Sequence, residues 1–131
     1  MTLLEDLISY CVSNSLLVGD GEDAFRDFLP ESPDACVAFI EYSGSPVHPV
    51  LDYVHRSVQV VVRCADAESA HTKASQLCNI FKSQTESLRI DFSETTWGQV
   101  YIRQTPFRID QDESDRVIYG FNLGITTNNL E

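Results

Sequence analysis

The 131-residue sequence has little positive charge, with nine lysine and arginine residues against 20 aspartate and glutamate residues. Its formal net charge of −11 argues against binding DNA through phosphate contacts, because such binding needs a basic surface. An acidic balance instead favours solubility, a basic partner, or a lining past which nucleic acid slides without adhering.

Long apolar runs are also absent, and none approaches the roughly 20 residues that a membrane-spanning helix needs. Residues 2–12 contain Glu5 and Asp6 and lack a basic start, so no secretory signal is expected there. We therefore expect a protein that is made in a cytoplasm and does not enter a membrane.

Motifs for metal or phosphate chemistry are missing as well. The sequence has no HExxH, no GxGxxG and no P-loop. Its three histidines do not form a zinc pattern with the cysteines, which are Cys11, Cys36, Cys64 and Cys78. No CxxC pair occurs and each cysteine lies in an apolar periodic segment, so buried free thiols are expected rather than disulfides.

Two patterns could still suggest a reactive site. Cys64 and His71 could meet as a thiol–imidazole pair, but the sequence supplies no third group to orient them. Acidic clusters at 20–27 and 110–115 lack the complete spacing of a calcium loop, so solvated charge is expected. We therefore predict no catalytic residues, no cofactor and no metal.

The most regular pattern in the chain occupies residues 57–81. Between residues 58 and 64 the side chains alternate, as in a strand with one buried face. Asp66 is placed to cap a helix, because its carboxylate can accept hydrogen bonds from amides of the first turn. The helix presents an apolar stripe formed by Ala67, Ala70, Ala74, Leu77, Cys78 and Phe81.

Periodicity predicts further elements on either side of this unit. A helix at 3–13 begins with a capping box formed by Thr2 and Glu5, and strands are expected at 35–42, 88–92, 99–107 and 116–127. The order is α-β-β-α-β-β-β, which predicts an α+β fold with two helices on one face of a mainly antiparallel sheet. Residues 1–131 form a single domain, and the tail 128–131 is expected to fray.

The connection 43–56 is long for a hairpin, and long loops in compact domains are often functional. It carries five apolar or aromatic residues that could pack on a neighbouring subunit: Val47, Val50, Leu51, Tyr53 and Val54. We therefore interpret it as a candidate assembly arm. A loop folded over its own sheet fits the sequence equally well.

A resemblance adds to this interpretation. The N-terminal helix, a central strand and a proline-containing loop precede the segment SVQVVVR at 57–63, which runs into the alanine-rich helix. The acidic turn 110–115 then leads into RVIYGFNL at 116–123. Together these features resemble the small minor capsid or tail terminator proteins of long-tailed bacteriophages, over residues 3–127.

The resemblance implies a structural virion protein without catalysis or a cofactor, located at the tail or the head–tail interface and assembled in the host cytoplasm. Such proteins form a ring, commonly a hexamer, that terminates the tail tube or joins the tail to the head. The implied partners are further copies of the chain, the tail tube protein and a head connector or completion protein. DNA would pass through the ring without specific binding.

Two other function classes remain open on the sequence. The first is an acidic adaptor or inhibitor that binds one basic protein as a monomer or dimer, which predicts charge concentrated on one face. The second is a small-molecule enzyme that uses the loop over the sheet, which predicts a deep pocket with convergent polar groups.

Overall fold

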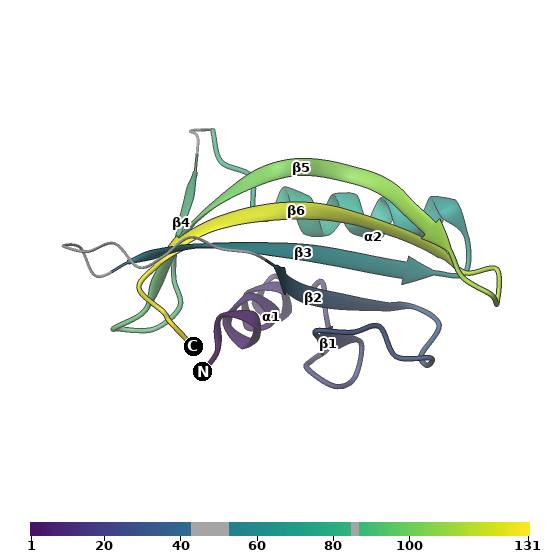
Figure 1. Cartoon of the computed structure of the whole chain (residues 1–131), viewed down its shortest axis with the longest axis horizontal. Helices are drawn as coiled ribbons and strands as arrows, with labels where there is room; N and C mark the ends of the chain where they lie inside the picture. The colour runs from purple at the N-terminus through teal and green to yellow at the C-terminus, as the bar shows by residue number, and fades with distance from the viewer. Residues whose placement is uncertain (43–52, 85–86) are drawn as a thin grey trace.

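The computed structural model describes residues 1–42, 53–84 and 87–131. Two helices pack on one side of a six-stranded sheet, in which the strands lie in the order β1-β2-β3-β6-β5-β4 (Figure 1). The α+β class is thus confirmed. The elements are α1 (Leu3–Ser13), β1 (Ala24–Arg26), β2 (Cys36–Tyr42), β3 (Val54–Cys64), α2 (Ala67–Asn79), β4 (Leu88–Asp91), β5 (Trp97–Gln111) and β6 (Val117–Thr127).

Both helices begin where their capping residues predict. The Thr2 hydroxyl accepts a hydrogen bond from the Glu5 amide at 3.2 Å, and the Glu5 carboxylate accepts from the Thr2 amide, which completes the capping box of α1. The Asp66 carboxylate accepts from the Ser69 amide at 2.8 Å at the start of α2. These local bonds satisfy amides that a helix start leaves free.

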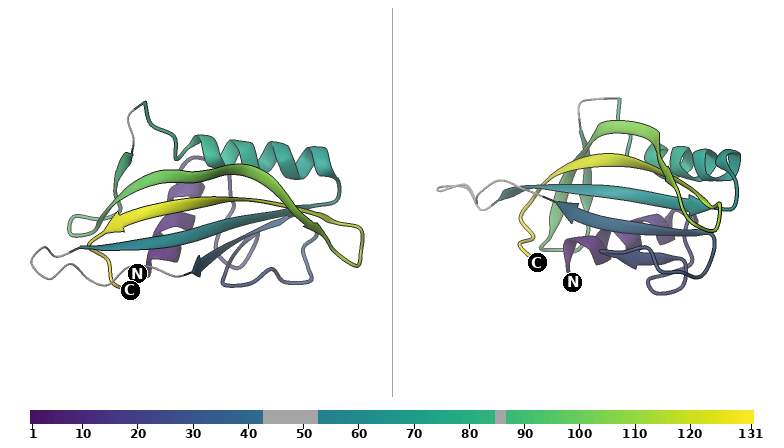
Figure 2. Two further views of the ribbon diagram at one scale, coloured as in Figure 1. Left: turned by 45° about the horizontal axis from the view of Figure 1, so that its top comes forward. Right: turned by 45° about the vertical axis from the view of Figure 1, so that its right-hand side comes forward.

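The centre of the sheet is the long antiparallel pair of β3 and β6, which runs from the Val54–Thr127 pair to the Cys64–Val117 pair. β5 continues along β6 with three register irregularities, and the two strands arch together over the helices (Figure 1, Figure 2). β2 pairs with β3 antiparallel, whereas β1 pairs with β2 parallel. Along these strands every second side chain points to the same side, so the sheet turns one apolar face toward the helices.

That apolar face forms the core. Phe39, Phe81 and Phe121 are its largest fully buried side chains, and the aliphatic side chains of both helices join the same cluster. The alanines at the start of the α2 stripe, Ala70 and Ala74, are fully buried, so the helix approaches the sheet closely there. Its packing partners are β3, β5 and β6.

The strands differ from the sequence prediction at several points, and β5 spans Trp97–Gln111 where the sequence predicts a strand at 99–107. An extra strand, β1, precedes β2, so the order is α-β-β-β-α-β-β-β. With three residues it is too short to show a period, and it exists because β2 offers a pairing edge. β3 begins at Val54, so residues 54–56 belong to a strand and not to the expected loop 43–56. The exposed His55 and half-buried Arg56 broke the apolar alternation that would have marked it.

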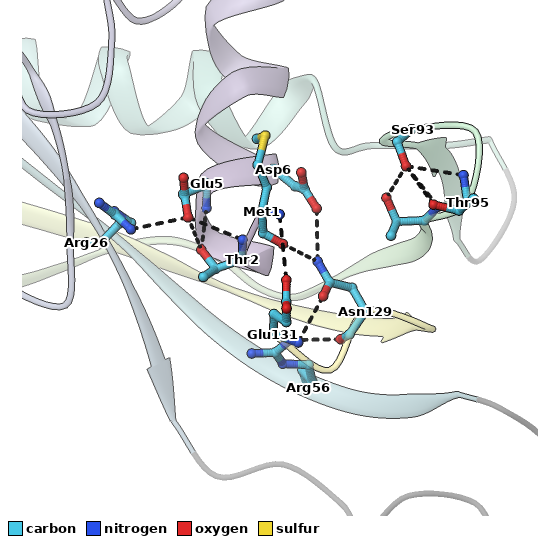
Figure 3. Close-up of polar contacts among 11 residues, drawn as sticks. Met1, Thr2, Glu5, Asp6, Arg26, Arg56, Ser93, Thr95, Asn129 and Glu131 are labelled. Atoms are coloured by element: carbon cyan, nitrogen blue, oxygen red, sulfur yellow. Dashed lines mark hydrogen bonds and ion pairs between the residues drawn. The ribbon is translucent and has the colours of Figure 1, made fainter.

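The predicted fraying of the C-terminal tail is wrong, because polar contacts tie the tail to the start of the chain (Figure 3). We call this group of residues the terminal clamp. The Asn129 side chain donates to the Met1 carbonyl and to Asp6 Oδ2, each at 3.1 Å. Arg56 Nη1 donates to the Asn129 carbonyl at 2.9 Å, and the Leu3 amide donates to the Glu131 carbonyl.

Candidate assembly surfaces

The predicted assembly arm is described only at its base. Val47, Val50 and Leu51 lie outside the described residues. Tyr53 is half-buried, and its ring meets the His55 ring edge-on at a centroid distance of 5.7 Å. Val54 is 8% exposed as the first residue of β3, so its side chain packs within its own subunit. The base of the arm is therefore fixed to the central strand of the sheet.

The sheet face opposite the helices, here called the helix-free face, is shaped by two glycines of β6. A Cβ at Gly124 would collide with the Tyr101 ring, and one at Gly120 would collide with the Ile109 side chain. Two side chains of β5 therefore lie across β6 on this face. Ile109 is 41% exposed there. Glycine at these positions is thus explained by the close packing of the Tyr101 and Ile109 side chains.

A polar hollow of about 420 Å³ lies in the middle of the helix-free face. It is lined by Ile40, Tyr42, Gln59, Arg103, Gln104 and Asn122. These residues come from β2, β3, β5 and β6, so the hollow crosses four strands of the sheet. None of them stands out in the sequence, because they lie singly or in pairs on strands that are far apart along the chain.

Arg103 is held in place over this hollow by neutral groups. Its Nη1 donates to the Ser57 hydroxyl at 3.1 Å and its Nη2 donates to the Tyr101 hydroxyl at 2.8 Å. The guanidinium also lies 5.6 Å from the centre of the Tyr101 ring, within the range of a cation–π contact. The hydrogen bond to Tyr101 raises the pKa of Arg103. The guanidinium is therefore a fixed positive charge.

Asn122 lies next to Arg103 in the hollow and is only partly satisfied. Its Nδ2 donates to Gln104 Oε1, while its own Oδ1 is buried and receives no hydrogen bond from the described residues. A buried acceptor without a donor costs about 1–3 kcal/mol. A hydrogen-bond donor from outside the chain would remove this cost if it reached the hollow.

One of the two acidic clusters of the sequence, at 110–115, lies at one end of the sheet beside Asp34, and Arg116 links the two. Arg116 Nη1 lies 3.1 Å from Asp34 Oδ1 and its Nε lies 2.7 Å from Asp112 Oδ2. Although burial acts to raise it, the pKa of Asp112 is lowered, because the Arg116 amide and guanidinium donate to its carboxylate. Sequence spacing could not show this meeting, since 78 residues separate Asp34 from Asp112.

The backbone that carries Asp34 is anchored by a buried arginine. Arg63 is 3% exposed and donates to the carbonyls of Glu31, Pro33 and Asp34. Three carbonyl acceptors satisfy a charge that would otherwise be costly inside the protein. The acidic end is therefore a rigid surface, built on the start of β2 and the turn between β5 and β6.

A second hollow, of about 500 Å³, lies on the helix side and contains Cys36, Cys64 and Lys73. Burial raises the pKa of both thiols, and Lys73 donates to the Leu16 carbonyl. The ring of His71 meets Tyr119 edge-on at 5.4 Å instead of facing Cys64. The described residues therefore bring together no activated nucleophile here.

All four cysteines are free and buried, as the sequence predicts. Burial raises the pKa of Cys11 to about 12 and also raises that of Cys78. Among residues 1–42, 53–84 and 87–131, no three His, Cys, Asp or Glu side chains are arranged to hold a metal ion. No helix in the same ranges has the length and apolar character needed to cross a membrane.

Comparison with known families shows what kind of protein carries these surfaces. The family model for the bacteriophage tail terminator protein matches residues 12–129. The chain belongs to the bacteriophage tail terminator family. The match spans every strand and α2 but only the end of α1, so the sheet carries the family features. A comparison with curated proteins found no match.

Family membership makes the chain a structural protein of the phage tail and a component of the virion. A tail terminator works through contacts with other tail or head proteins. The surfaces described above are therefore the places to look for its function.

Proposed function

We propose that the chain is a subunit of an oligomeric ring, most simply a hexamer, that terminates the tail tube and joins the tail to the head. The observation that carries this proposal is the match to the tail terminator family over residues 12–129. Its partners are copies of itself, the tail tube protein and a head connector or completion protein. The role requires no catalysis and no cofactor, and assembly takes place in the host cytoplasm.

A ring of identical subunits needs a heterologous interface, in which one patch meets a different patch on the next copy. The sheet offers two edge strands, β1 with three residues and β4 with four. Edge strands present backbone groups that a strand of another copy can pair with. Because both edges are short, we propose that the arm supplies the remaining contact through Val47, Val50 and Leu51, with Tyr53 and Val54 at its base.

The acidic end supports passage of DNA through such a ring. Glu31 and Asp34 present exposed carboxylates at one end of each subunit, beside the turn between β5 and β6. Repeated around a ring, these charges would form an acidic collar. A collar of this kind repels phosphates, so DNA would pass without specific binding.

The same convergence of charge favours a second candidate. An acidic adaptor or inhibitor that binds one basic protein as a monomer would concentrate its charge on one face, and Arg116 gathers two acidic segments at one end. This candidate differs from the ring in its stoichiometry, because it needs no contact between copies.

Native mass spectrometry across a range of protein concentrations, alone and with purified tail tubes, separates the two candidates. The ring proposal expects one closed oligomer mass that does not grow further with concentration. A chain that stays monomeric at every concentration and also on the tube would overturn the ring and favour the adaptor.

A further inference from the structure

Arg103 is one of three arginines without a carboxylate partner among the described residues, and the others are Arg63 and Arg108, of which Arg108 bonds to Gln111 through its Nη2. Arg26, Arg56, Arg89 and Arg116 each form an ion pair with a carboxylate, and Arg63 is satisfied by three backbone carbonyls. Arg103 interacts instead with neutral hydroxyls, those of Ser57, Tyr101 and Tyr42. A fixed cation with neutral partners, on a chain of net charge −11, can receive a carboxylate from outside.

The hollow beside Arg103 gives a second, independent indication of a partner. Asn122 is 8% exposed and has a buried Oδ1 that receives no hydrogen bond from the described residues. Neither α1 nor α2 covers this side of the sheet (Figure 2). An unsatisfied acceptor next to an unpaired cation fits a surface that is completed by another molecule.

The chain itself carries a segment of complementary charge. The turn between β5 and β6 is rigid, because Asp112 Oδ1 accepts hydrogen bonds from the amides of Ser114 and Arg116 at 3.0 and 2.9 Å. Glu113 and Asp115 are exposed on this turn, and Glu113 has no partner among the described residues. Both exposed carboxylates thus belong to a pre-formed loop. This loop forms the end of the β5–β6 hairpin (Figure 1).

We propose that the polar hollow around Arg103 receives the β5–β6 turn of a neighbouring copy, with Glu113 pairing with the guanidinium. The turn of the same copy cannot reach, because Arg103 and Glu113 are ten residues apart along one hairpin arm, roughly 30 Å at strand spacing. The contact joins two different patches, so it is heterologous and can close a ring. The inference rests on the proposed ring and assigns one of its interfaces.

Charge exchange tests this contact. We expect R103E and the double variant E113R/D115R each to need a roughly tenfold or higher concentration to assemble in native mass spectrometry, since like charges would then meet. An equal mixture of the two should restore the ring mass, because every junction in an alternating ring again joins opposite charges. A single chain carrying all three substitutions should also assemble.

Matched controls separate this contact from effects of net charge and of folding. R108E makes the same change of charge on the same strand, at an arginine whose Nη2 bonds to Gln111, and should assemble like the wild type. E94R reverses the charge of one exposed carboxylate in another turn, and it should also assemble like the wild type. Because E113R/D115R alters only an exposed turn, it tests the contact even if R103E fails to fold.

Each outcome decides a different claim. Rings of wild-type mass from R103E or from E113R/D115R at wild-type concentrations would overturn the inference and leave the ring proposal intact. Loss of assembly in both variants without rescue in the mixture would overturn the pairing of these two sites. Absence of rings from the wild type itself, alone and on tail tubes, would refute the proposed function and with it this contact.

Discussion

The Asn129 side chain joins the two ends of the chain, because its Nδ2 lies 3.1 Å from Asp6 Oδ2 (Figure 3). The same amide group donates to the Met1 carbonyl, and its Oδ1 accepts from the Glu131 amide at 2.9 Å. Asn129 is 5% exposed and Asp6 is 7% exposed. The tail after β6 is therefore a packed part of the fold that holds the first turn of α1.

Replacing Asn129 with alanine should lower the free energy of unfolding by about 1–3 kcal/mol, because it leaves buried polar partners unsatisfied. Urea denaturation followed by circular dichroism measures the change. The control is Leu130→Ala at the next position, whose side chain is 58% exposed and should be nearly neutral. An equal loss in the two variants would mean that the clamp does not depend on the Asn129 side chain.

Asp6 should make stability depend on pH in an unusual direction for a carboxylate. Burial raises its pKa above the ordinary value of 3.8, an effect larger than the opposing hydrogen bond from Asn129. The folded state thus holds the Asp6 proton more tightly than the unfolded state does. The stabilisation is complete below pH 3.8 and is lost as the pH rises through the raised pKa.

The variant D6N isolates this effect, since asparagine stays neutral and its side-chain oxygen can still accept from Asn129. As the pH rises from 3.8 through the raised pKa of Asp6, the wild type should lose unfolding free energy relative to D6N. At higher pH the difference between the two proteins should stay constant. Urea unfolding at a series of pH values gives the difference, and an NMR titration gives the pKa of Asp6. A difference independent of pH, or an Asp6 pKa at or below 3.8, would contradict the prediction.

The elements that depend on neighbouring residues along the chain could be predicted from the sequence. The capping box of Thr2 and Glu5 and the N-cap at Asp66 determine where the helices begin, and alternation at 58–64 marks the central strand. β1 could not be predicted in this way, because its three residues form a strand only when β2 lies alongside. The buried tail was missed for the same reason, since its partner Asp6 is 123 residues away.

The candidate surfaces were largely beyond prediction from the sequence. Arg103 and Asn122 lie on different strands and meet only through the β5–β6 register, which three irregularities shift. The acidic cluster at 110–115 was recognised, but its link to Asp34 through Arg116 depends on the full fold. Gly120 and Gly124 also belong to this face, but only the fold shows that the Ile109 and Tyr101 side chains lie against them.

Gly124 gives a test of how the helix-free face is packed. In G124A the new Cβ would collide with the Tyr101 ring, which must then move away from Arg103. We expect a loss of about 1–3 kcal/mol in unfolding free energy. Thermal or urea denaturation measures it.

A second background checks the cause of that loss. In a Y101A chain the space above Gly124 is empty, so the same glycine-to-alanine change should be neutral or slightly stabilising, as it restricts the unfolded chain. Equal destabilisation in both backgrounds would show that the Tyr101 ring is not what requires glycine at this position.

The thiols should be inert in the folded protein. All four cysteines are at most 8% exposed, and burial raises the pKa of each, which leaves little thiolate at neutral pH. A thiol-reactive chromogenic reagent should therefore label none of them rapidly in buffer and all four in denaturant. The variant A65C, which places a thiol at an exposed position, should gain one fast-reacting group, whereas fast labelling of the wild type would refute the prediction.

Replacement of residues 47–51 with glycine and serine tests the proposed assembly arm without disturbing the strand that follows. Tyr53 and Val54 are retained because Val54 is buried and pairs with Thr127 in the β3–β6 ladder, so removing it would damage the fold. We expect a chain that unfolds at the same temperature as the wild type but no longer gives a ring mass. The same replacement at 82–84, a segment of exposed residues after α2, should leave assembly unchanged. Rings of unchanged mass from the 47–51 variant would contradict the assembly arm and favour a loop that folds over its own sheet. The contact between copies would then have to be formed by the short edge strands and by the hollow around Arg103.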